Sequence, residues 1–116
     1  MKLYDSELKV MEILWNGGDL TAKQISDKLH EEIGWNKNTT YTVIKKCINK
    51  GAIKRSGNNY LCTPIVSREE VEDYETKELI EKYFDGSGVK LFAAFLNRNQ
   101  LSDSEREMIR KMIEKE

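Results

Sequence analysis

The sequence predicts a mainly α-helical protein with one small β-hairpin, followed by a helical C-terminal region. Apolar residues recur at the 3.6-residue spacing of helices through most of the 116 residues. Helix-capping signatures stand in front of several of these segments. Between residues 52 and 63 the pattern changes to two short extended runs around a Ser-Gly-Asn-Asn turn, which is typical of a hairpin.

The first two helices follow from an apolar stripe and a capping box. The stripe ends at Gly17 and Gly18 and predicts a first helix; its members are Leu8, Met11, Ile13, Leu14 and Trp15. Thr21 and Gln24 are spaced as a capping box, in which each side chain satisfies a backbone N–H of the other. This box predicts a short second helix with an inward face of Ile25, Leu29 and Ile33.

A third helix is predicted over residues 37–50, capped by Asn36 and followed by Gly51, which tolerates a left-handed backbone. Its residues separate into two faces at the helical period. The inward face carries Thr40, Val43, Ile44, Cys47 and Ile48. The outward face is polar and cationic, with Asn38, Tyr41, Thr42, Lys45 and Asn49, and with Lys46 at its flank.

Three helices and a hairpin over residues 52–63, which Pro64 ends, follow the order of a winged helix-turn-helix module. In that fold the third helix enters the major groove of DNA and the hairpin, called the wing, lies on the neighbouring phosphates. We therefore predict residues 1–66 to be a winged-helix DNA-binding domain and residues 67–116 to be a helical dimerisation domain.

The charge pattern supports DNA as the partner. Although 34% of the residues are charged, the segment from Ile33 to Ser67 has no Asp or Glu. Such a surface attracts a polyanion, with lysines for phosphates and Asn, Thr and Tyr for phosphates or base edges; the alternative is an ordinary solvated basic face. The predicted DNA-binding residues are Thr21, Lys37, Asn38, Thr39, Tyr41, Thr42, Lys45, Lys46, Lys54, Arg55 and Asn58.

The C-terminal half differs in charge and in apolar content. Residues 1–66 carry ten basic and seven acidic side chains, whereas residues 67–116 carry nine and thirteen. A capping box at Ser67 opens a long acidic helix to about Phe84, a short apolar helix follows, and a box at Ser102 opens the last helix. Three such helices cannot bury their apolar residues alone, so we expect pairing with a second copy, the alternative being packing on the N-terminal module. The predicted dimer interface comprises Tyr83, Phe84, Leu91, Phe92, Phe95, Leu96, Ile109 and Met112.

Several classes of protein and site are excluded by the residues present. The sequence has no signal-peptide pattern and no segment of membrane-spanning length, so we expect a cytoplasmic protein without membrane contact. It has no Ser/His/Asp or Cys/His set and no phosphate-binding glycine loop, which argues against an enzyme. Cys47 and Cys62 lack metal-ligand spacing and are expected to pack as small apolar groups, the alternative being a redox sensor.

With this order established, the chain resembles the penicillinase-repressor family of winged-helix transcriptional repressors, over essentially its whole length. The resemblance rests on the spacing of several pieces together: Val10–Trp15, Thr21, Gly34–Thr39, Thr42, Ile44, Lys50–Gly51 and Leu101–Ser102. It differs where the family often has Ser-Pro, since Asn36-Lys37 stands there. The usual capping Ser of the first helix is replaced by Tyr4, which leaves Asp5 as the expected cap.

The resemblance implies a homodimer that represses by occupying a palindromic operator in double-stranded DNA. It also implies derepression by a regulatory protease, and the matching scissile bond is Ala94–Phe95. The paired cysteines that hold metal in the copper-responsive branch have no counterpart here, so we expect no metal site and no cofactor. The competing interpretation is a winged helix that binds protein and not DNA, since the fold permits both.

Overall fold

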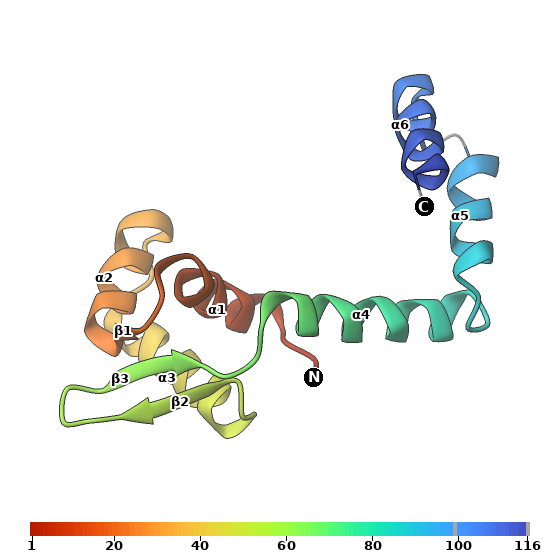
Figure 1. Ribbon diagram of the computed structural model, residues 1–116. Helices are drawn as coiled ribbons and strands as arrows, with labels where there is room; N and C mark the ends of the chain where they lie inside the picture. The colour runs from red at the N-terminus through yellow and green to blue at the C-terminus, as the bar shows by residue number, and fades with distance from the viewer. Residues whose placement is uncertain (99, 116) are drawn as a thin grey trace. The chain divides into compact units, whose positions relative to one another are not determined.

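The computed structural model describes residues 1–98 and 100–115 (Figure 1). Within these residues it has six helices and three short strands, which confirms the predicted mainly α fold with a hairpin. The chain divides into two compact units, Met1–Glu75 and Thr76–Glu116. In chain order the elements are α1 (Asp5–Gly17), β1 (Leu20–Thr21), α2 (Ala22–Ile33), α3 (Lys37–Asn49), β2 (Ile53–Ser56), β3 (Leu61–Pro64), α4 (Arg68–Tyr83), α5 (Gly88–Asn97) and α6 (Asp103–Glu114).

The core of the first unit lies where α1, α2 and α3 meet. Its fully buried side chains come from all three helices and from the hairpin, and include Met11, Leu14, Ile25, Leu29, Ile44, Cys47, Ile53 and Cys62. Burial of large apolar side chains is the main source of stability in such a domain. Ile33 was predicted to point inward, and that prediction is wrong. It is 42% exposed, because it closes α2 at the rim of a surface hollow between α1 and α2.

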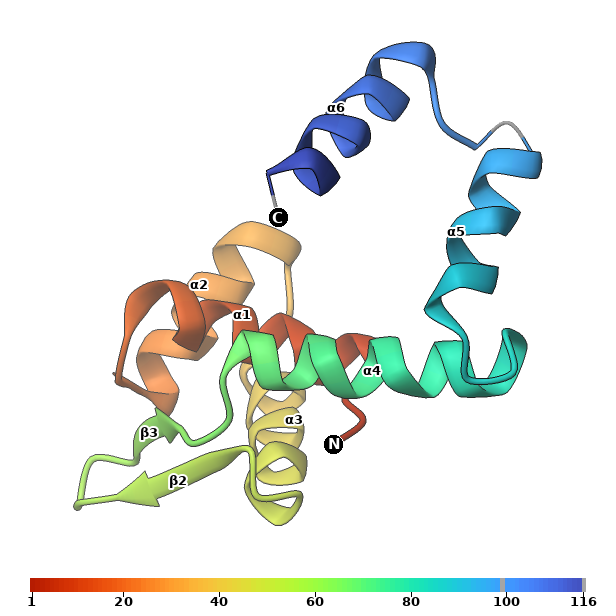
Figure 2. The same ribbon diagram turned by 45° about the vertical axis from the view of Figure 1, so that its right-hand side comes forward.

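The sheet has one strand more than the sequence predicted. β1 joins the hairpin to give the antiparallel order β1-β3-β2, with Leu20 opposite Cys62 and Thr21 opposite Leu61. Across the hairpin Arg55 also pairs with Cys62. A two-residue strand has no alternation from which it could be recognised. Figures 1 and 2 both show α3 beside this hairpin, with which it also shares close backbone contacts.

The helix starts largely follow the predicted caps. Thr21 Oγ1 accepts the Gln24 N–H at 3.1 Å while the Gln24 side chain accepts the Thr21 N–H at 2.8 Å. The boxes at Ser67 and Ser102 are formed in the same way. The expected cap at Asp5 is wrong, because Asp5 is the first helical residue and Tyr4 is the cap position. There the Glu7 carboxylate accepts the Tyr4 N–H at 2.7 Å, so the acid three residues on supplies the cap.

The start of α4 packs on the first unit. The Trp15 indole N–H donates to the Val66 carbonyl at 2.9 Å, and the Arg68 guanidinium donates to both carboxylate oxygens of Glu12, at 2.6 and 3.3 Å. Arg68 also lies over the Trp15 ring, and Val71 is buried. These contacts explain why the first compact unit extends to Glu75. The functional boundary at residue 66 stays a prediction.

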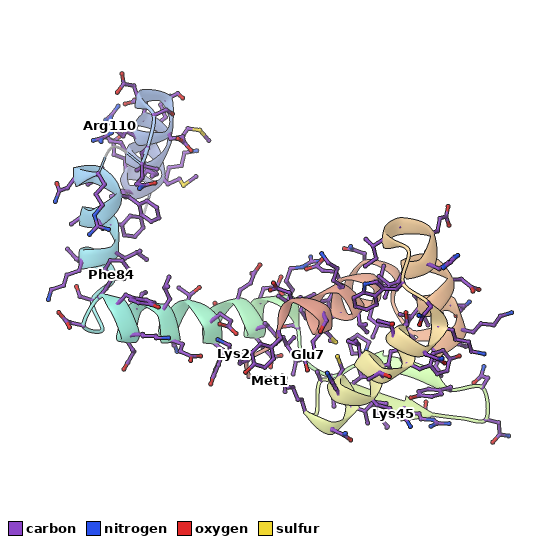
Figure 3. The ribbon with its side chains drawn as sticks, turned by 180° about the vertical axis from the view of Figure 1, so that it is seen from behind. Met1, Lys2, Glu7, Lys45, Phe84 and Arg110 are labelled. Atoms are coloured by element: carbon purple, nitrogen blue, oxygen red, sulfur yellow. The ribbon has the colours of Figure 1, made fainter. Side chains whose placement is uncertain are left out.

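The second unit contains the end of α4 with α5 and α6. Ser87 caps α5, accepting the Lys90 N–H at 3.2 Å, and Arg106 of α6 donates to the Leu96 carbonyl at 2.9 Å. Neither α5 nor α6 has a buried side chain among its described residues. Figure 3 labels Phe84, which directly follows the last residue of α4, and Arg110 on α6. In the part of the chain that the structure describes, no helix has the length and apolar character needed to cross a membrane.

Candidate nucleic-acid interface

The outward face of α3 is the most cationic helical surface of the first unit. The Asn36 side chain accepts the Thr39 N–H at 2.8 Å and so fixes the start of the helix, as predicted. Lys37, Asn38, Tyr41, Thr42 and Lys45 line a shallow hollow on this face. All of them are exposed except Tyr41, which is half-buried; Thr39 and Lys46 are exposed as well. Figure 3 marks Lys45 on this helix.

The opposite face of α3 fixes how the helix is rotated. Thr40, Val43, Ile44 and Cys47 are buried against α1 and α2, and Ile48 is half-buried. Because these residues recur at three- and four-residue spacing, they leave the polar face turned to solvent. The predicted division of this helix into two faces is therefore confirmed by the burial of its side chains.

The wing brings Lys54, Arg55 and Asn58 to the surface of the same unit, and all three side chains are exposed. Lys54 and Arg55 lie on β2, which has close backbone contacts with α3. The structure thus gathers ten of the eleven predicted residues on α3 and the hairpin that packs beside it. The remaining one, Thr21, is half-buried at the start of α2, where its hydroxyl oxygen accepts the Gln24 N–H.

A tyrosine ladder, made of Arg55, Tyr60, Tyr41 and Lys37, connects the wing with α3. The Arg55 guanidinium carbon lies 3.6 Å from the Tyr60 ring centroid. The Tyr60 and Tyr41 rings meet edge to face, with centroids 5.7 Å apart and an interplanar angle of 77°. The Lys37 ammonium lies 5.4 Å from the Tyr41 centroid. Both distances from cation to ring are within the range of attractive cation–π contacts.

Tyr60 was not among the DNA-binding residues predicted from the sequence. Its backbone has φ of 55°, in the left-handed region, and its carbonyl accepts the Ala22 N–H at 2.9 Å. Burial raises the pKa of the Tyr60 hydroxyl, although the nearby Arg55 charge opposes that shift. No sequence pattern marks a left-handed tyrosine, since Gly and Asn are the residues expected there. The useful signal was its place directly after the Asn58-Asn59 turn.

Not every cation of the acid-free segment faces outward. Lys50 donates to Glu7 Oε1 at 2.7 Å and to the Lys2 carbonyl at 3.1 Å, and its ammonium lies 4.5 Å from the Tyr4 ring centroid. Glu7 is only 2% exposed. Lys50 is therefore an internal partner of α1, and the outward charge comes from the other five cations.

The two thiols are not reactive, and the potential metal ligands do not form a cluster among the described residues. Both thiols are free and buried. Burial raises the pKa of Cys47 to about 12 and that of Cys62 to about 11, which keeps them protonated and weakly nucleophilic. Within residues 1–98 and 100–115 no three His, Cys, Asp or Glu side chains gather in a way that could hold a metal ion.

Comparison with solved structures concerns the first unit. The DNA-binding domain of the repressor BlaI in solution superposes with a TM-score of 0.55 at 22% identity, covering 60% of this chain and 87% of that one. Monomeric BlaI of Bacillus licheniformis, solved in complex with the blaP half-operator, superposes with a TM-score of 0.53 at 24% identity, covering 60% and 88%. At these identities the likeness establishes the fold.

Sequence comparison extends further along the chain. It is 23% identical over 106 residues to the penicillinase repressor of Bacillus licheniformis, covering 90% of this chain and 83% of that protein. It is 25% identical over 116 residues to the methicillin resistance regulatory protein MecI of Staphylococcus aureus (strain N315), covering 98% and 94%. The family model described as penicillinase repressor matches residues 3–115. Since that match spans both compact units, this chain belongs to the penicillinase repressor family, a family of repressors and not of enzymes.

Proposed function

We propose that the protein is a transcriptional repressor that binds a palindromic operator as a homodimer, with α3 in the major groove and the wing on the flanking backbone. One observation carries the proposal: the exposed face of α3 has three lysines and several hydrogen-bonding side chains, and no carboxylate. A solvent-facing helix that binds nothing ordinarily carries charges of both signs. Because such a repressor acts on operator DNA, we propose that it is located in the cytoplasm.

The residues of this face suit distinct parts of a DNA duplex. Asn38 has the amide that pairs with an adenine edge, and Thr42 has a hydroxyl and a methyl group for base edges or a thymine methyl. Lys37, Lys45 and Lys46 on α3, with Lys54 and Arg55 on the wing, suit phosphates. Thr39 at the start of α3 and Asn58 at the tip of the wing would add hydrogen bonds to the DNA backbone. Monomeric BlaI, which shares this fold, was solved in complex with the blaP half-operator, and this supports DNA as the partner.

The second unit supplies the proposed dimer contact. Its described helices leave large apolar side chains in solvent, with Phe92, Phe95 and Leu96 exposed by 54%, 40% and 45%. Monomeric proteins rarely expose so many neighbouring apolar groups, and pairing with a second copy is the commonest way of covering them. The proposed interface adds Tyr83, Phe84, Leu91, Ile109 and Met112. Two copies would then read half-sites about 34 Å apart, or a multiple of that spacing.

We infer that cleavage of the Ala94–Phe95 bond is one route to derepression. The bond lies inside α5, so a protease must first unwind that helix locally, and the turn at Gly86–Gly88 gives it room to open. A cut there would divide the proposed interface and lower dimer affinity. The alternative is that Ala93 and Ala94 are small only because helices approach closely. Mass spectrometry of the repressor from induced cells distinguishes the two, since a protein that stays full length rules cleavage out.

Titration onto DNA tests the central proposal. The full-length protein is titrated onto random duplex, and onto the duplex upstream of its own neighbouring genes, at two salt concentrations. We expect affinity that falls with salt and is higher for the upstream duplex. A Lys45→Glu, Thr42→Ala double variant should lose binding, while Lys9→Glu, which changes an exposed lysine on α1, serves as the matched control. Unchanged affinity in the double variant would instead favour a winged helix that binds protein.

A further inference from the structure

We propose that Tyr60 is a positioning residue for DNA binding, which holds the Arg55 guanidinium at a fixed place relative to the recognition helix α3. This inference rests on the proposed function and deepens it. Its basis is the tyrosine ladder, in which one tyrosine from the wing and one from α3 stand between two cations. Arg55 is the cation of the wing and Lys37 is the cation of the helix.

The Arg55 guanidinium carbon, 3.6 Å from the Tyr60 ring centroid, is close enough for the flat face of the guanidinium to lie on the ring. A guanidinium has its N–H donors in its own plane, so a ring against its flat face consumes none of them. Among the residues that the structure describes, no carboxylate forms an ion pair with Arg55. No carboxylate therefore competes with a phosphate for the planar donors of Arg55, and a guanidinium binds a phosphate through two parallel hydrogen bonds.

The backbone of Tyr60 supports a specific role for its side chain. A bulky residue at φ of 55° is uncommon, because its Cβ crowds the backbone, and Asn is tolerated far better there. The hydroxyl of Tyr60 is buried and has no hydrogen-bond partner among the described residues. Neither the backbone conformation nor the hydroxyl therefore accounts for tyrosine at this position. What the ring does provide is the contact with Arg55 on one side and with Tyr41 on the other.

The ladder also gives the wing a defined place beside α3. Tyr41 is half-buried and follows the rotation of α3, which the buried face of that helix sets. Tyr60 packs edge to face on Tyr41, so the position of Arg55 depends on α3 through two aromatic rings. A phosphate contact that is held in place loses less side-chain freedom on binding than one made by a mobile arginine. Tyr60 acts on DNA through Arg55, without touching DNA itself.

A double-mutant cycle tests this dependence. The variants are Tyr60→Asn, which suits the left-handed backbone but removes the ring, Arg55→Gln, and the two combined, each titrated onto one duplex over a range of salt. If Tyr60 acts through Arg55, each single variant weakens binding by about tenfold. Each also lowers the slope of log affinity against log salt concentration by about one, the value expected for one lost phosphate contact. The combined variant then binds no more weakly than either single variant.

Tyr60→Phe is the matched control, because it keeps the ring and removes only the unpaired hydroxyl. We expect its affinity and salt slope to equal those of the wild-type protein. Proton NMR gives a readout without DNA, since the Arg55 side-chain protons should be shifted upfield by the Tyr60 ring in the wild type and in Tyr60→Phe, but not in Tyr60→Asn.

Additive losses in the combined variant, or a loss in Tyr60→Phe equal to that in Tyr60→Asn, would overturn the role of Tyr60. An unshifted Arg55 in the wild-type spectrum would overturn it as well, even if Tyr60→Asn failed to fold. A wild-type protein that binds no duplex at all would instead overturn the proposed function, and this inference with it. The two failures are thus told apart by the wild-type titration.

Discussion

The ammonium nitrogen of Lys50, at the end of α3, lies 2.7 Å from Oε1 of Glu7, in the first turn of α1. The same carboxylate oxygen accepts the Tyr4 N–H, and the same ammonium donates to the Lys2 carbonyl (Figure 3 labels Lys2 and Glu7). One ion pair therefore joins the N-terminal segment, the start of α1 and the end of α3. We expect this ion pair to stabilise the first unit.

Removing one partner of this pair should destabilise the protein. Lys50→Met leaves the Glu7 carboxylate, whose side chain is 3% exposed, without its main hydrogen-bond donor. Loss of a partner for such a buried group costs about 2 kcal/mol in the free energy of unfolding. Urea denaturation measures this loss. Lys45→Met, on the exposed face of the same helix, is the control and should change the free energy by no more than about 0.5 kcal/mol.

The pair also predicts a dependence of stability on pH. Burial works against ionisation of Glu7, but hydrogen bonds from Lys50 and Tyr4 outweigh it and hold the pKa of Glu7 below its ordinary value of 4.5. Well above pH 4.5 the carboxylate is ionised in both the folded and the unfolded chain, so its contribution is complete. Below that pH the unfolded chain binds the proton first, and the contribution is lost as pH falls through the folded pKa. The difference in unfolding free energy between wild type and Glu7→Gln should therefore shrink with acidification; a difference independent of pH would contradict it.

Mutations should distinguish the side chains that contact bases from those that contact the DNA backbone. Asn38→Ala or Thr42→Ala should relax the preference at one base pair, by about 1–3 kcal/mol, because a good contact to a base edge is lost. Lys54→Gln should weaken binding to all sequences alike and lower the salt slope by about one contact. Competition binding against a panel of single-base operator variants measures both effects. A uniform loss in the Asn38 and Thr42 variants would mean that they contact only the backbone.

A fragment of residues 1–75 should be folded and monomeric, and it should bind the operator much more weakly than the whole chain. It keeps Arg68 against Glu12 and keeps Val71 buried, whereas a fragment ending at residue 65 loses both. We expect the shorter fragment to lose about 2 kcal/mol from the burial of Val71 alone. Analytical ultracentrifugation gives the oligomeric state and thermal denaturation gives the stability. A dimer of residues 1–75 would place the dimer contact outside the second unit.

Both thiols should react slowly in the folded protein. Burial raises the pKa of Cys47 to about 12 and of Cys62 to about 11, and the thiolate is the reactive form. Ellman's reagent should therefore label the native protein only as fast as the protein unfolds around the thiols. In urea it should label both thiols at once. Rapid labelling of one native cysteine would restore the redox-sensor alternative.

The sequence predicted the large elements because each has its own local signal. The two faces of α3 follow from its period, and Thr21, Asn36, Ser67 and Ser102 follow from the chemistry of capping. The misses arose where tertiary contacts decide. β1 exists only because Leu20 and Thr21 meet β3. Tyr4 occupies a cap position because Glu7, itself held by Lys50, accepts its N–H.

The candidate interface shows the same limit. The exposure of Asn38, Thr42 and Lys45 follows from helical spacing, but the roles of Lys50 and Tyr60 depend on residues distant in the sequence. Six cations in an acid-free segment look equivalent when read along the chain. In the folded first unit one of them binds Glu7 and another stacks on a tyrosine ring. Composition predicted the sign of this surface, whereas packing determines which charges it presents.

The attachment of α4 to α1 has a consequence for how quickly repression could end. Trp15 and Arg68 hold the start of α4 on the first unit, more than twenty residues before the proposed cleavage site. A cut at Ala94–Phe95 would therefore leave the first unit folded and still able to bind operator half-sites briefly. Transcription would resume at a pace set by dissociation and dilution of that surviving fragment, and destruction of the protein would be unnecessary.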